Sequence, residues 1–115
     1  MGSLQYAGGH LRTPLFVVLG HEGCGVVKAA LATMFERQQH GSYIQTLVDN
    51  ILPGLLNVGS EASAETCLST AVEANVRWSI HQILETVEGQ DATRAGARVV
   101  GAVYEIASGH VRLLA

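Results

Sequence analysis

The apolar positions of this sequence change their spacing along the chain, and each change marks a predicted element. Five consecutive apolar residues occupy positions 15–19, between Pro14 and Gly20. A short unbroken apolar run with such ends is typical of a strand that is buried on both faces of a parallel sheet. We therefore expect a strand at 15–19 with another strand beside it, because an exposed apolar edge invites aggregation.

Helical spacing of apolar residues, with steps of three and four positions, follows this strand. We expect helices at residues 4–11, 25–38, 43–56 and 63–87. Pro53 should kink or break the third of them, because proline lacks the backbone N–H that a helix interior needs. Ser63 suits the N-cap of the fourth, with Glu65 in its first turn.

The end of the chain predicts a hairpin. Residues 89–96 are polar and bounded by glycines, which indicates a loop. Two β-rich runs, 98–106 and 110–114, flank the turn residues Ser108 and Gly109. Together these elements predict an α/β fold with a three-strand sheet core flanked by helices, and 115 residues suit one domain over 1–115.

Composition and charge narrow the classes of function. The chain is 48% apolar, enough to bury a core, and its net charge of −3 argues against a sequence-independent nucleic-acid binder, which needs a basic face. It has no apolar run of about eighteen residues, so we expect no membrane partner. The N-terminus lacks the pattern of a signal peptide, and two cysteines do not make a disulfide framework. We expect a cytoplasmic protein.

The candidate chemistry lies where the strand at 15–19 ends. His21 and Cys24 stand three positions apart, among Gly20, Gly23 and Gly25. Imidazole and thiolate are ligands that zinc prefers, but structural zinc sites want four protein ligands and catalytic sites three. The glycines would let the chain turn sharply and approach a ligand. A tight turn with Cys24 as a small buried apolar residue is the alternative from the residues alone.

The longer stretch PLFVVLGHEGCGVVKAAL, residues 14–31, closely resembles the β-class carbonic anhydrases. GSLQYA, VEANVRWSIHQI and VVGAVYEIASGHVRLL resemble further segments of that family in the same order. The resemblance implies the C-terminal part of the β-carbonic-anhydrase fold and the zinc-dependent reversible hydration of CO2 to bicarbonate. It also implies that His21 and Cys24 are metal ligands, and that the chain forms homodimers or higher oligomers.

One part of the family pattern has no counterpart here. The family's remaining zinc ligand is a cysteine in a Cys-x-Asp-x-Arg segment, which also supplies an aspartate and an arginine to the site, and this sequence contains no such segment. The resemblance therefore implies a truncated domain that begins after the family's first two strands and retains half of the zinc site. We expect the chain alone to be weak or inactive, with its catalytic residues unknown.

No other residue is a good candidate to complete the site. Cys67 falls on the apolar stripe of its predicted helix, where packing is its expected role. His10 precedes the strand and belongs at the wrong end of the sheet, whereas Glu22 lies inside the loop with no predictable direction. We expect the remaining histidines, His40, His81 and His110, to be exposed to solvent.

Three functions remain open at this point. The first is a zinc lyase whose missing ligands come from water, a partner or unrecognised residues. The second is a non-catalytic oligomerising protein or a small-anion binder that uses the Gly20–Gly25 turn and the following helix N-terminus. The third is a fragment whose partner chain carries the missing strands. In each case we expect self-association through the helix at 43–56 and the N-terminal segment.

Overall fold

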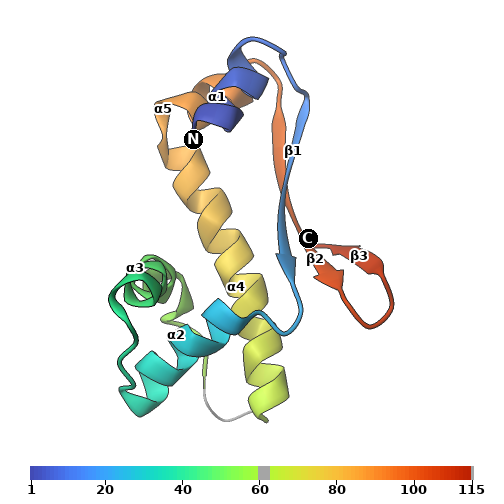
Figure 1. Ribbon diagram of the computed structural model, residues 1–115. Coiled ribbons are helices and arrows are strands. Elements are labelled where there is room, and N and C mark those ends of the chain that lie inside the picture. Colours follow the sequence, from blue (N-terminus) through green and yellow to red (C-terminus); the bar gives the residue numbers. More distant parts are fainter. Residues whose placement is uncertain (60–62, 115) are drawn as a thin grey trace.

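The computed structural model describes residues 1–59 and 63–114 and has a thin α/β architecture (Figure 1). Three strands form one sheet in the order β1-β2-β3. β1 (Leu15–His21) is parallel to β2 (Arg98–Glu105), and β3 (His110–Leu113) returns antiparallel to β2. The long helix α4 (Ala64–Glu85) runs along one face of β1 and β2. The expected fold class, a three-strand sheet core flanked by helices, is confirmed.

Close contact between α4 and the sheet depends on two glycines that lie on neighbouring strands. A Cβ atom at Gly20 would lie 2.6 Å from Cγ2 of Val76, and one at Gly101 would lie 2.8 Å from its Cγ1. Real Cβ atoms do not approach other atoms so closely, so a side chain at either position would force Val76 or the backbone to shift. The two glycines form a notch that receives Val76, which is buried at 3% exposure.

The expectation that strand 15–19 is buried on both faces is wrong for the single chain. β1 lies at the edge of the sheet among the described residues, and its burial alternates along the strand. Leu15, Val17 and Leu19 are 50%, 47% and 54% exposed, because α4 covers only the opposite face. β1 also runs two residues further than expected, since Gly20 and His21 pair with Val103 and Tyr104 of β2.

The helices near the end of β1 bring most of the core together. α2 (Gly25–Glu36) packs against α3 (Ser42–Ile51) and α4. α3 stops at Ile51 and continues as the 3-10 helix η1 (Leu52–Leu55), which confirms the break expected at Pro53. Ser63 caps α4 as expected, since its side chain accepts from the backbone N–H of Thr66. The largest fully buried side chains are Leu55, Val27 and Val48.

The expectation of a loop at 89–96 is wrong, because the helix α5 (Val87–Arg94) occupies most of this range. Thr86 ends α4 and caps α5: its hydroxyl donates to the carbonyl of Ile83 and accepts from the backbone N–H of Gly89. A Cβ at Gly89 would collide with the Ile83 carbonyl oxygen, so this tight helix-to-helix turn needs glycine. The helix therefore depends on capping rather than on apolar periodicity, which is why the hydrophobic pattern did not reveal it.

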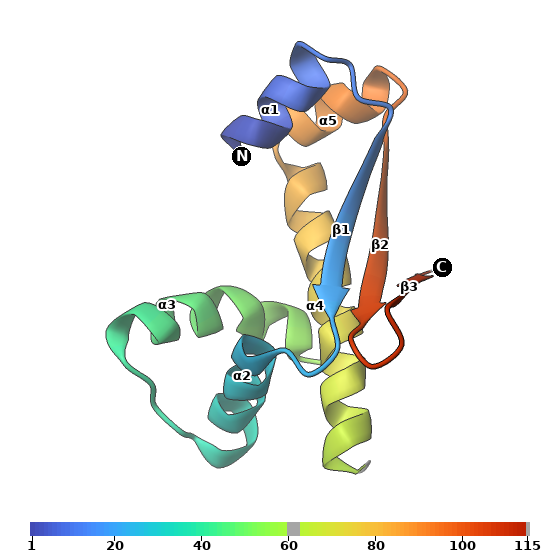
Figure 2. The ribbon, with the colours of Figure 1, turned by 45° about the vertical axis from the view of Figure 1, so that its right-hand side comes forward.

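α5 and α1 (Gly2–Gly9) lie side by side at the end of the sheet where β1 begins, whereas α2 and α3 lie at the other end (Figure 2). α1 starts two residues earlier than the expected range of 4–11 and ends at Gly9.

Within the part of the chain that the structure describes, no helix combines the length and apolar character that crossing a bilayer requires.

Candidate functional site

The His21–Cys24 loop connects the end of β1 to the start of α2. His21 is the last residue of β1 and pairs with Tyr104, and Cys24 is the N-cap of α2. Gly23 has a φ of +69°, in the left-handed region that favours glycine, so it makes the turn between the two. Gly20 lies inside the strand and Gly25 inside α2, so of the three expected turn glycines only Gly23 is in the turn itself.

The imidazole of His21 is oriented by the backbone of the next residue. Its Nδ1 lies 3.0 Å from the carbonyl oxygen of Glu22. Because a carbonyl can only accept, this contact places a proton on Nδ1, and in the neutral imidazole the lone pair is then on Nε2. That tautomer presents Nε2 as a metal ligand, and a backbone carbonyl is a common partner for the second nitrogen of a ligating histidine. Cys24 has a free, half-buried thiol three positions along.

Glu22 has a direction that local sequence reasoning missed. Its Oε1 accepts a hydrogen bond of 2.6 Å from the backbone N–H of Ala107, in the turn between β2 and β3. Its own backbone N–H donates to the carbonyl of Tyr104 at 3.0 Å. Glu22 and Ala107 are far apart in sequence and meet only because β1 and β2 are parallel and end together. No local pattern could therefore have revealed the contact.

A cavity of about 390 Å³ lies beside the loop, at the ends of β1 and β2. Three carboxylates, Glu22, Glu65 and Glu105, line it together with Arg112. Arg112 is engaged by carboxylates, at 2.7 Å from Glu73 and 3.7 Å from Glu105. The charged groups around this cavity are therefore mostly negative, and its arginine is already paired.

The other histidines and the second cysteine are held away from this loop. Cys67 is buried and its thiol donates to the Gly59 carbonyl at 3.4 Å, which confirms its packing role. His40 corrects our expectation of an exposed side chain: it is half-buried, with Nε2 3.0 Å from the Ala29 carbonyl oxygen. His10 lies at the opposite end of β1, as expected, and its ring stacks on Tyr6. His81 and His110 are exposed, as expected.

The residues present fit zinc in kind but not in number. Imidazole and thiolate are the donors that zinc prefers, and the contact of His21 Nδ1 with the Glu22 carbonyl leaves Nε2 as the nitrogen for a metal. Across residues 1–59 and 63–114, no three side chains of His, Cys, Asp or Glu come together in an arrangement that could hold a metal ion. The described part of one chain therefore holds at most two ligands of a centre that needs three or four.

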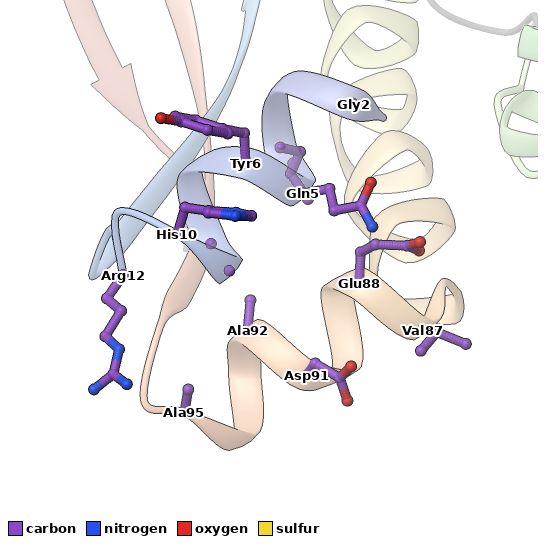
Figure 3. A pocket seen from close by; sticks show the side chains of 13 residues that line it. Gly2, Gln5, Tyr6, His10, Arg12, Val87, Glu88, Asp91, Ala92 and Ala95 are labelled. Atoms are coloured by element: carbon purple, nitrogen blue, oxygen red, sulfur yellow. The ribbon is translucent and has the colours of Figure 1, made fainter.

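A second cavity, of about 870 Å³, lies between α1 and α5 at the end of the sheet away from the His21–Cys24 loop (Figure 3). The stacked rings of Tyr6 and His10 lie on one side of it, and Glu88 and Asp91 on the other. It shares no lining residue with the smaller cavity beside the loop.

Comparison with known proteins gives one family. A family model described as carbonic anhydrase matches residues 1–111. A carbonic anhydrase of Mycolicibacterium smegmatis is 30% identical over 113 residues, which cover 98% of this chain and 55% of that protein. The chain thus spans about half the length of this curated relative.

Solved structures agree on the fold. A β-carbonic anhydrase of Aspergillus fumigatus superposes with a TM-score of 0.85 at 23% identity, over 98% of this chain and 54% of that one. One of two tetrameric β-carbonic anhydrases of Sordaria macrospora also gives 0.85, at 20% identity, over 98% of this chain and 58% of its own. Both likenesses cover just over half of the larger protein.

Proposed function

Because the chain belongs to the β-class carbonic anhydrase family, we propose that His21 and Cys24 supply two zinc ligands to a site for the reversible hydration of CO2. The remaining ligands come from outside the described residues of a single chain. Alone, the chain hydrates CO2 far more slowly than its longer relatives, or not at all. Zinc, when bound, would supply the Lewis acid that activates water.

The observation that carries this proposal is the state of His21. Its Nδ1 is engaged by the Glu22 carbonyl, so Nε2 has its lone pair free for a metal, and Cys24 follows in the same loop. A loop kept only as a tight turn would need Gly23 but not this contact of the His21 ring. The low rate follows from the number of ligands, since two donors hold zinc weakly and no described carboxylate is placed to complete the set.

Two alternatives predict different metal behaviour. A small-anion binder would use the first turn of α2, where Cys24 makes no side-chain cap, and it would need no zinc. A fragment with a partner chain would bind one zinc ion per pair of chains only when the partner is present.

The test is zinc stoichiometry together with stopped-flow hydration of CO2, on the wild type, His21→Ala and Cys24→Ser. We expect less than one tightly bound zinc ion per chain, weaker binding in both variants, and a rate far below that of an enzyme of the family. A normal enzymatic rate that both variants abolish would mean that the site is complete. Zinc binding that neither variant changes would exclude His21 and Cys24 as ligands.

Self-association is part of the same proposal. Beyond the exposed face of β1, α3 exposes Tyr43 and Leu47, and Leu56 is exposed directly after η1; Tyr43 is 88% exposed. Apolar surface of this extent is typical of interaction sites. A similar structure comes from a tetrameric enzyme, which supports a homodimer or larger assembly. Light scattering that shows a stable monomer at micromolar concentration would contradict it.

A further inference from the structure

We propose that Glu22 is a positioning residue, which fastens the His21–Cys24 loop to the turn between β2 and β3. The inference rests on the proposed function in one respect, namely that this loop bears metal ligands. Figure 2 shows the two segments beside one another at the end of the sheet. They are joined by the 2.6 Å contact from the Ala107 N–H to the carboxylate of Glu22.

Three separate contacts meet at this one residue. The Glu22 carbonyl oxygen receives the His21 ring at 3.0 Å, its N–H donates to Tyr104, and its side chain accepts from Ala107. The first contact orients the imidazole, and the other two attach the same residue to β2 and to the turn that follows. Any movement of Glu22 away from the hairpin would therefore move the group that orients His21.

The carboxylate adds a contact that the strand ladder does not provide. β1 ends at His21, and the backbone bond from Glu22 to Tyr104 is the last one to β2. The side chain then reaches beyond the end of β2 to Ala107, while the turn itself is closed by Ser108 and Gly109 donating to the Glu105 carbonyl. A hydrogen bond to a charged acceptor is stronger than one between neutral groups.

A surface carboxylate that serves only solubility would show a different set of contacts. Glu22 belongs to none of the ion pairs found among the described residues; Arg112, which lines the same cavity, pairs instead with Glu73 and Glu105. The carboxylate of Glu22 is thus directed to a backbone amide 85 positions away rather than to the nearby cation.

The first measurement is amide hydrogen exchange by NMR on the metal-free chain, for wild type, Glu22→Ala and Glu22→Gln. Loss of the acceptor in Glu22→Ala should speed exchange at Ala107 by about fivefold, the equivalent of one modest hydrogen bond. The amides of Gly23 and Cys24 should also exchange faster. Glu22→Gln keeps a side-chain oxygen and should restore most of the protection. Glu65→Gln, a change of charge in the same cavity without this contact, should leave all three amides unchanged.

The second measurement is titration with Co²⁺, followed by the absorption band of a cobalt–thiolate bond. We expect binding about fivefold weaker in Glu22→Ala than in wild type, with recovery in Glu22→Gln. Circular dichroism establishes that each variant is folded. His21→Ala tests separately whether the loop binds the metal at all.

The outcomes separate the two proposals. If exchange at Ala107, Gly23 and Cys24 is the same in Glu22→Ala as in wild type, the positioning role is overturned, whatever the metal does. If exchange rises but cobalt binds wild type and Glu22→Ala equally through His21, the contact does not position ligands and the inference is again wrong. If His21→Ala leaves cobalt binding unchanged, the proposed function fails, and the amides of Gly23 and Cys24 alone decide the role of Glu22.

Discussion

The two faces of β1 have the same apolar character but different surroundings. On the inner face, Val18 packs against the core and Gly20 admits Val76 from α4. On the outer face, Leu15, Val17 and Leu19 are each about half exposed. Hydrophobicity alone does not distinguish the two. The difference is that the inner face is shaped around one particular side chain, and the outer face has no such partner within the chain.

A face that packs within the chain differs in its shape from a face that is left for another molecule. Where α4 packs against the sheet, the residues of both elements are constrained: Val76 of the helix needs the space that Gly20 and Gly101 leave on the strands. The outer face is apolar from Leu15 to Leu19 and has no glycine notch, so these side chains are free to meet a partner surface of their own size. Adding or removing atoms on the two faces should therefore have unequal effects.

Adding atoms to the inner face should have the largest effect. In Gly20→Ala the new Cβ atom would lie 2.6 Å from Cγ2 of Val76 and 3.4 Å from Cγ1 of Val72. Overpacking of this kind costs about 1–3 kcal/mol or more. Denaturant unfolding followed by circular dichroism measures it. Val17→Ile adds a methylene to the outer face and is the matched control, with an expected change within about 0.5 kcal/mol. Equal losses in the two variants would remove the distinction between the faces.

Removing atoms from the same contact should have the next largest effect. Val76→Ala deletes two methyl groups at a 3% exposed site and leaves the glycine notch empty, which should cost about 2 kcal/mol of unfolding free energy. Leu19→Ala deletes more atoms, but from a side chain that is 54% exposed, and should cost less. The order of these two losses, measured by thermal and urea unfolding, would contradict the comparison if it were reversed.

The turn that ends β1 should respond to a backbone change of intermediate size. Gly23 has a φ of +69° and open space around its Cβ position, so Gly23→Ala introduces strain without a clash. We expect a loss of about 1 kcal/mol, the usual cost of placing an alanine in the left-handed region. Gly2→Ala, also in open space but inside α1, is the control and should not destabilise the fold. An unchanged midpoint for Gly23→Ala would mean that the turn relaxes freely.

Polar residues on the outer face should change the fold least and the assembly most. Replacing Val17 and Leu19 by threonine keeps strand propensity and should change the unfolding free energy of a single chain by no more than about 0.5 kcal/mol. It should also shift sedimentation toward smaller species, if this face joins copies of the chain. The same pair of changes on Ile44 and Leu47 of α3 tests the other exposed patch. Whichever pair leaves the assembly intact does not lie at an interface.

Much of the fold, and the place of the candidate site in it, could be predicted from the amino-acid sequence. The changes of apolar spacing located β1, α2, α3, α4 and the hairpin within a few residues, because burial of one face leaves a periodic trace. Pro53 and Ser63 marked a break and a cap, since each acts on backbone hydrogen bonds next to it. His21 and Cys24 were proposed as metal ligands from their residue types, their spacing and their position after an apolar run, and that role stays a prediction.

Features that depend on residues far apart in the chain came only from the tertiary structure. α5 rests on a cap and a glycine turn rather than on periodicity, and the notch needs Gly20, Gly101 and Val76 from three elements. The exposed outer face of β1 depends on what the rest of the chain covers, which an apolar run cannot reveal. Glu22 meets Ala107 because two parallel strands end at the same level. Local patterns record how a residue meets its own neighbours, whereas these contacts exist only once the strands are in register.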